Sequence, residues 1–223
     1  SEMIVYNKMI FNNLYLKNKT ERNKTTANIS LKELVLKEAK GKNDVELGLE
    51  NIVFLLDAHS DSLLFDLSWN DDSDEDKNKG NLEAVFLPND IHGGKLHLTT
   101  SDVIINDSLW NLSPTCFVDF KKNNVRFEEF AIYCGNQSMK VSGNFPKTSR
   151  DTLYLNFNHL DVSDFDLLTA GIGIDVDGII NGDLQFSGIS DRFTFFSNLD
   201  VSNIGLNNHL VGDAYIDANW NAP

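Results

Sequence analysis

Apolar and polar residues alternate along the last fifty residues of the chain. In the segment 178–188, Leu184 and Phe186 fall on one face of an extended strand, and Asp183 and Gln185 fall on the other. The same alternation recurs twice before the chain ends. Because successive side chains of a strand point to opposite faces, a period of two predicts three strands of a sheet with one dry and one wet face.

The dry face of these three strands is the candidate binding surface, because no long helical segment is available to cover it. We expect its side chains to form the inner wall of a groove. Glycines within the strands, such as Gly182 and Gly212, indicate either ordinary turns and bulges or a sheet curved into a trough. The candidate lining residues are Ile180, Leu184, Phe186, Phe193, Phe195, Leu199, Val201, Ile216 and Trp220.

Alternation at lower regularity runs through the preceding 160 residues, with turn residues about every ten positions. The predicted strands cover residues 4–17, 25–37, 44–57, 62–69, 81–87, 95–106, 115–121, 124–134, 138–144 and 152–158. Strands at this spacing without intervening helices are typical of an antiparallel meander. We therefore expect an all-β fold and one elongated domain over residues 1–223.

Two segments depart from the strand pattern. A short helix is predicted near 163–170, because Ser163 can cap it and Phe165 lies on the same helical face as Leu168. The acidic segment 70–80 is predicted to be a solvated loop. Its carboxylates fit several positions of a calcium-binding loop, but Lys77 occupies the position of the turn glycine, so calcium binding is the weaker interpretation.

Charge narrows the range of partners. The formal net charge of the 223 residues is -14, and residues 151–223 contain eleven Asp, no Glu and one basic residue, Arg192. Nucleic-acid binding requires clustered Lys and Arg, so nucleic acid is excluded as a partner. The overall charge also argues against docking on an anionic membrane surface.

No pattern of catalytic or metal-binding residues stands out. Asp175 and Asp177 alternate with apolar residues, which favours the wet face of a strand over an acid–base pair. His92 and His97 flank a turn, but no third ligand lies at metal spacing. We expect a protein that is not an enzyme and that uses no metal and no cofactor.

The two cysteines, Cys116 and Cys134, do not define a compartment. A hairpin turn at 122–124 would place Cys116 opposite a residue near Glu129, so a disulfide would need a bulge or another register. Free buried thiols are at least as compatible with the sequence. No signal peptide or membrane-spanning segment is present, and both ends lie directly beside strand-like sequence, so we expect the chain to be part of a longer protein.

Four features in order give a resemblance to a known family. Together they span residues 107–220, and each is weak alone. They are Leu109–Pro114, a tryptophan-x-x-x-proline entry to a strand; Gly135–Gly143; Asp151–Val162, followed by the short Leu-Leu helix; and Val176–Leu184 continuing through Gly212–Trp220. This series resembles the C-terminal region of the TamB family, within the AsmA-like and repeating-β-groove lipid transfer proteins. Residues 1–105 fit it only as generic amphipathic strands.

The resemblance implies a long, curved sheet folded like a taco around an apolar trough. It also implies a periplasmic module of a protein anchored in the inner membrane of a Gram-negative bacterium. Its partners would be phospholipids or other acyl-chain ligands moved between the two membranes, or an Omp85-family barrel in outer-membrane protein assembly. A structural or adhesive β-sandwich or β-helix with a closed core is the alternative, and a β-rich hydrolase is the least supported.

Overall fold

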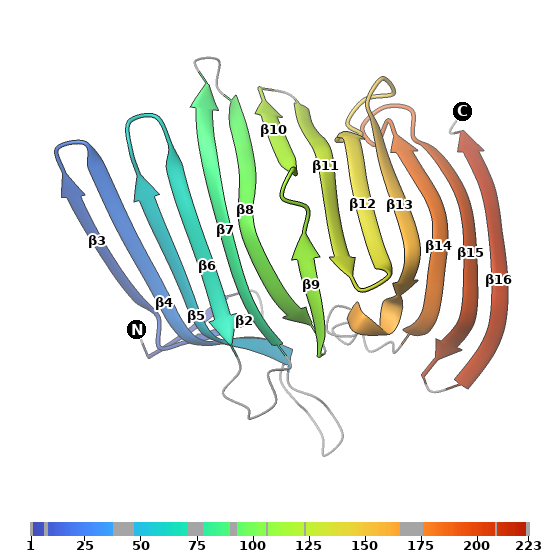
Figure 1. Cartoon of the computed structure of the whole chain (residues 1–223), viewed down its shortest axis with the longest axis horizontal. Helices are drawn as coiled ribbons and strands as arrows, with labels where there is room; N and C mark the ends of the chain where they lie inside the picture. Colours follow the sequence, from blue (N-terminus) through green and yellow to red (C-terminus); the bar gives the residue numbers. More distant parts are fainter. Residues whose placement is uncertain are drawn as a thin grey trace.

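The computed structural model describes residues 2–6, 9–37, 47–70, 78–89, 93–105, 107–122, 124–165, 176–207 and 209–221. Within these ranges the chain forms one antiparallel sheet of sixteen strands (Figure 1). The strands are β1 (Met3–Tyr6), β2 (Met9–Asn12), β3 (Tyr15–Glu21), β4 (Lys24–Lys37), β5 (Leu47–Ala58), β6 (Leu63–Asn70), β7 (Asn78–Asn89), β8 (Gly93–Ile105), β9 (Ser108–Leu112), β10 (Phe117–Lys121), β11 (Asn124–Cys134), β12 (Gln137–Asn144), β13 (Thr152–Asp161), β14 (Val176–Ser187), β15 (Thr194–Leu206) and β16 (His209–Asn221). The predicted all-β class and antiparallel meander are confirmed.

The order of the strands in the sheet follows their order in the chain. At two places in the sheet, two short consecutive strands lie end to end where a single long strand would otherwise lie. β2 and β3 both pair with β4, and β9 and β10 both lie between β8 and β11. Every other strand from β4 to β15 pairs with its sequence neighbours. The sheet is therefore a series of hairpins, as expected from the short spacing between predicted strands.

The predicted strand 4–17 is wrong as a single element, because it covers parts of three strands, β1, β2 and the start of β3. Asn13 has a φ of 55°, in the left-handed region that Asn adopts more readily than most residues. Its amide donates to the carbonyl of Glu2 at 2.9 Å, so the chain turns away from a straight extension. The alternation of apolar and polar residues in this segment did not predict the turn at Asn13.

A second interruption separates β9 from β10. Leu112 pairs with Ile132, and the next pairing is Phe117 with Glu128. Between them Pro114 lacks an N–H, and Ser113 donates to the carbonyl of Ala131 at 2.8 Å. The tryptophan-x-x-x-proline segment is therefore a strand followed by a break.

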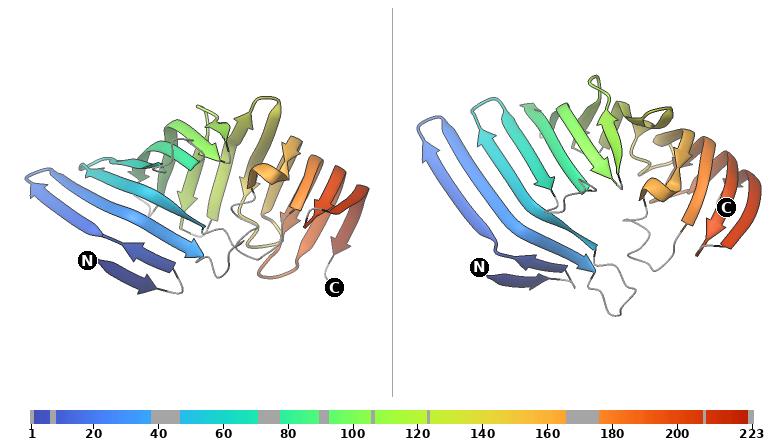
Figure 2. Two further views of the ribbon diagram at one scale, coloured as in Figure 1. Left: turned by 90° about the horizontal axis from the view of Figure 1, so that it is seen from below. Right: turned by 60° about the horizontal axis from the view of Figure 1, so that its bottom comes forward.

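The sheet is bent into an arch, seen nearly end-on in Figure 2. Positive φ angles at Gly178, Gly182 and Gly212 accompany register shifts between β14 and β15, between β13 and β14, and between β15 and β16. Such bulges raise the local twist and bend of the strands. The glycines of the C-terminal segment thus lie where the sheet curves.

The start of the predicted helix near 163–170 lies in a 3₁₀ turn, η1 (Val162–Phe165), on the inner side of the arch (Figure 2), and residues 166–170 lie outside the described residues. Its N-terminal cap is Asp161, whose Oδ1 accepts hydrogen bonds from the Ser163 amide at 3.1 Å and hydroxyl at 2.7 Å. Leu168 lies outside the described residues. Residues 71–77 of the predicted acidic loop also lie outside the described residues. The two ends of that predicted loop, Asn70 and residues 78–80, belong to β6 and β7.

Candidate binding groove

An uninterrupted row of paired residues crosses the sheet from β4 to β16. Residues that lie directly opposite each other in an antiparallel pair point to the same face. Eleven strand spacings of about 4.8 Å make this row roughly 50 Å long. In order it contains Thr25, Ala58, Leu63, Phe86, Leu96, Val118, Phe127, Gly143, Leu153, Phe186, Phe195 and Trp220.

Parallel rows on the same face continue the apolar surface. Leu184 pairs with Leu155 on one side and Ser197 on the other, Leu199 pairs with Ile216, and Ile180 pairs with Val201. The rings of Phe186 and Phe195 lie 5.3 Å apart at 41°. We call this face, which carries the rows just described, the apolar face.

The apolar face is the inside of the arch. Trp110 belongs to this face. Its partner Val103 lies two positions along β8 from Ser101, so Val103 and Ser101 point to the same side of the sheet. Ser101 pairs with Leu82, and Leu82 pairs with Leu67, so all of them lie on the apolar face. The Trp110 ring contacts Phe165 of η1 at a centroid distance of 5.1 Å. Since η1 lies on the inner side in Figure 2, the concave side of the sheet is the apolar one.

Eight of the nine predicted lining residues lie on this face in strand register. The exception is Phe193, which precedes β15 and has no strand partner among the described residues. Trp220 is 59% exposed and Ile216 is 43% exposed, and the others are half-buried. Within the described residues no second sheet covers the face, so these side chains border an open groove.

The groove extends into the N-terminal half, which the predicted site omitted. Phe54 and Phe65 have ring centroids 6.0 Å apart, and Phe86 and Phe120 are 6.1 Å apart. Leu63, Phe65, Phe86, Pro88, Leu96 and Phe120 border a hollow of about 700 Å³. The same alternation of apolar residues was present in the sequence there, but it is less regular than in the C-terminal strands, so it was not predicted as part of the site.

At the N-terminal edge, the outer part of β3 ends the apolar face with polar residues, whereas β1, the other edge strand there, carries the exposed apolar residues Met3, Val5 and Tyr6. Asn18 and Thr20 on β3 pair with Ala27 and Thr25, and every residue of β3 is exposed. Lys17 and Lys19 occupy the other face of the same strand. Lysine and polar side chains on an edge strand oppose edge-to-edge association.

One mouth of the groove is held by η1. Asp164 is buried and accepts hydrogen bonds from the Ser108 hydroxyl at 2.8 Å and from Gln137 Nε2 at 2.9 Å. Gln137 Oε1 in turn accepts from the Asp161 amide at 2.7 Å. These bonds tie η1 to β9 and β12, and they place Phe165 on Trp110.

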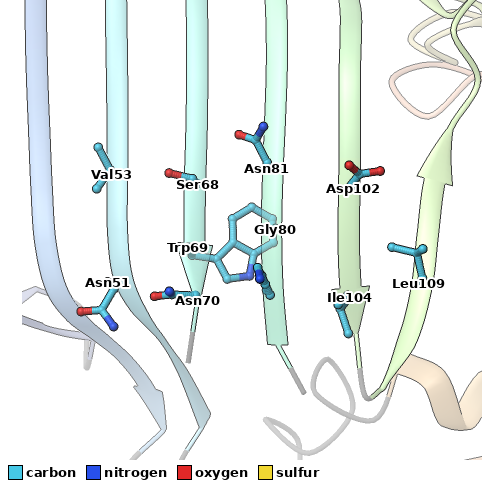
Figure 3. Close-up of a pocket in the computed structure, with 11 residues that line it drawn as sticks. Asn51, Val53, Ser68, Trp69, Asn70, Gly80, Asn81, Asp102, Ile104 and Leu109 are labelled. Carbon is cyan, nitrogen blue, oxygen red and sulfur yellow. The ribbon is translucent and has the colours of Figure 1, made fainter. Parts of the chain in front are cut away.

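The opposite face of the sheet is polar over β13 to β16, whereas over β5 to β9 it also carries exposed apolar side chains such as Leu55, Leu64 and Leu109. Asn156 pairs with Asp183, which pairs with Asn198, which pairs with Asp217, and Asn156 Nδ2 donates to Asp183 Oδ1 at 2.9 Å. A pocket of about 490 Å³ lies over β5 to β9 (Figure 3), bordered by both polar and apolar side chains. The side chains with the register of this face are Asn51, Val53, Ser68, Asn70, Lys79, Asn81, Asp102, Ile104 and Leu109.

The remaining candidate chemical groups lie apart from one another. Asp177 is in β14 opposite Gly205, whereas Asp175 and His92 lie outside the described residues. His97 stacks on Phe117 with ring centroids 4.5 Å apart. Among the described residues, no cluster of His, Cys, Asp and Glu is arranged to hold a metal ion.

Both cysteines are free thiols, which resolves the alternative left open by the sequence. Cys116 is fully buried, and burial raises its thiol pKa. Cys134 also has a raised pKa, first because of burial and second because of the nearby Asp164 carboxylate. Both thiols are therefore protonated and weakly nucleophilic at neutral pH.

Comparisons with family models, with curated proteins and with solved structures give no match to this chain. In the described part of the chain no helix has the length and apolar character needed to cross a membrane. The assignment of a function therefore rests on the geometry of the groove.

Proposed function

We propose that the concave apolar face binds the acyl chains of lipids. The observation that supports this most directly is the row from Ala58 to Trp220, which crosses eleven strand positions without a polar side chain. Half-buried Leu and Phe side chains give such a groove an apolar floor. On the outer face of β13 to β16, paired Asn and Asp side chains keep that part of the sheet in contact with water.

The energetics favour an elongated apolar ligand. Each CH₂ removed from water contributes about 0.8 kcal/mol, so a chain that lies along several side chains recovers several kcal/mol. An open apolar surface of this size on a soluble protein usually marks a binding site.

The resemblance to the TamB family supplies a biological setting. In that setting the chain is a periplasmic module whose parent is anchored in the inner membrane. The groove would conduct phospholipid acyl chains between the inner and outer membranes, or would assist outer-membrane protein assembly with an Omp85-family barrel. Both roles require an apolar surface and no active site.

Lipid extraction and mass spectrometry of gently purified protein test the proposal. We expect co-purified lipid, or uptake of lipid from vesicles by the delipidated chain. Leu184→Asp should lower the bound lipid at least fivefold, because a carboxylate on the groove floor must be desolvated by a bound acyl chain. Gln185→Asp is the matched control, since it adds the same charge to the polar face of the same strand.

Folding of both variants is checked by thermal denaturation. Trp220→Ala, at a 59% exposed position of the groove, provides a second variant with a small folding cost. Absence of lipid together with no uptake from vesicles would refute acyl-chain binding. An environment-sensitive apolar dye that fails to bind the native chain would point instead to a structural role.

A further inference from the structure

Two loops at the other mouth of the groove join into one hydrogen-bonded unit. They connect β12 to β13 and β14 to β15, and both lie at the upper edge of the sheet in Figure 1. The Ile189 amide donates to the Pro146 carbonyl at 2.7 Å, and the Ser190 amide donates to the Lys147 carbonyl at 3.0 Å. We call residues 145–151 and 188–192 the loop platform.

The loop platform is fixed at its base as well as between its loops. Pro146 is fully buried, and the Phe145 amide donates to the Val125 carbonyl at 2.7 Å. Asp191 Oδ2 accepts from the Ser149 amide at 3.0 Å. The hydrogen bonds from Ser149 and then Arg192 hold the pKa of Asp191 below its ordinary value, so this carboxylate is ionised and engaged at neutral pH.

Two large apolar side chains project from this rigid base. Phe145 is 47% exposed and Ile189 is 56% exposed, although each is next to a buried residue, Pro146 and Gly188. Single exposed apolar residues are common on protein surfaces. Two of them held on hydrogen-bonded loops form a contact surface that needs no ordering before it binds.

Cations surround these apolar side chains in a chain that is otherwise acidic. Lys147, Arg150 and Arg192 are exposed, and none of them forms an ion pair within the described residues. The two carboxylates of the platform, Asp151 and Asp191, are occupied by hydrogen bonds from Thr148 and Ser149. These carboxylates keep their negative charge, so the three cations and two carboxylates give the platform a local net charge of +1 in a chain of net charge -14.

We propose that the loop platform docks on the headgroup layer of an anionic bilayer, with Phe145 and Ile189 inserted at the interface. Charge complementarity selects this partner, because Lys and Arg bind anionic headgroups while aromatic and aliphatic tips enter the acyl boundary. The net charge of -14 does not prevent this contact, since the Debye length is about 8 Å at physiological ionic strength and the carboxylates of β14 to β16 lie along the strands.

The proposal is independent of lipid binding in the groove, and it would bring one mouth of the arch to a membrane. Vesicle flotation of the whole chain tests it, with phosphatidylcholine vesicles that contain or lack phosphatidylglycerol. We expect flotation only with the anionic vesicles, weakened by added salt. The combined Lys147→Gln, Arg150→Gln and Arg192→Gln variant should bind roughly a hundredfold more weakly, from about fivefold for each charge.

Matched controls separate the platform from general effects. Lys17→Gln, Lys19→Gln and Arg22→Gln remove the same charge from exposed positions at the N-terminal edge and should leave flotation unchanged. Phe145→Ser with Ile189→Ser should weaken flotation at least tenfold. Leu210→Ser with Val211→Ser, which alters the 77% and 68% exposed residues at the far end of β16, should not.

Several outcomes would overturn the proposal. These are absence of wild-type flotation with anionic vesicles, platform variants that float like the wild type, or an equal loss in the charge control. The Leu184→Asp variant should still float with anionic vesicles. If this variant no longer floated, the vesicles would be binding through the groove and not through the loop platform. Thermal denaturation confirms that each variant is folded before it is compared.

Discussion

At the scale of single residues, two glycines show how backbone conformation shapes the groove. Gly182 and Gly212 have φ angles of 123° and 126°, which L-residues rarely adopt. A Cβ at Gly182 would clash with the carbonyl of Asn198 on the neighbouring strand, whereas a Cβ at Gly212 would meet nothing within 4 Å. Gly182 is thus required by both conformation and space, and Gly212 only by conformation.

Alanine substitution separates these two requirements. We expect Gly212→Ala to lower the free energy of unfolding by about 1–2 kcal/mol from backbone strain alone. Gly182→Ala should cost at least about 1 kcal/mol more, because the strand must also move away from Asn198. Urea denaturation of the two variants measures the difference, and equal losses would contradict a steric role for Gly182.

The sequence predicted eight of the nine groove residues on one face, because strict alternation fixes which side chains share a side of a strand. It could not place Phe193, because the point at which β15 begins depends on the loop platform. It also gave no sign that Asp164 is buried, since its partners Ser108 and Gln137 are 56 and 27 residues away in the chain.

At the scale of elements, η1 is held by side chains more than by its own backbone. A four-residue 3₁₀ turn has little intrinsic stability. The hydrogen bonds from Ser108 and Gln137 to Asp164, with the Phe165–Trp110 contact, fix its position at the groove mouth. Asp161 is still paired with Ile179 in β13, so the turn begins directly at the end of the strand.

Asp164→Asn tests this attachment through a neighbouring thiol. The Asp164 carboxylate contributes to the raised pKa of Cys134, so removing its charge should lower that pKa and speed alkylation of Cys134 between pH 7 and 9. Loss of one hydrogen bond to the buried side chain should also cost about 1–2 kcal/mol of stability. Iodoacetamide labelling followed by peptide mass spectrometry reports each cysteine separately.

Cys116 serves as the internal reference, because it is fully buried and Asp164 is not among the causes of its raised pKa. Faster labelling of Cys134 alone would support the electrostatic effect, and equal acceleration of both thiols would indicate general unfolding instead. Asp183→Asn, which alters an exposed carboxylate bonded to Asn156, should change neither rate.

At the scale of the whole molecule, the sheet behaves as a nearly one-dimensional array. From β4 to β15, packing is almost entirely between strands that are adjacent in the sheet. Local patterns therefore predicted the strands and their order well. The direction of the bend, the two broken strands and the pairing of two loops about 40 residues apart could not be read locally, because each depends on contacts between several strands.

Stability should decline from the centre of this array to its ends. β3 is exposed along its whole length, and β16 has a neighbour on one side only, whereas β11 to β13 are paired on both sides. We expect hydrogen exchange to be slowest in β11 to β13 and progressively faster toward β3 and β16. Uniform protection across all strands would show that the sheet unfolds as one cooperative unit.

The hairpin order of the strands also bears on how such a protein changes over evolution. When each strand is bonded to its sequence neighbours, gain or loss of one internal hairpin leaves the remaining strands able to rejoin with their faces unchanged. Each event changes the width of the sheet by two strand spacings, about 9.6 Å. Duplication or deletion of short gene segments can therefore adjust the molecule in fixed increments without the redesign of a core.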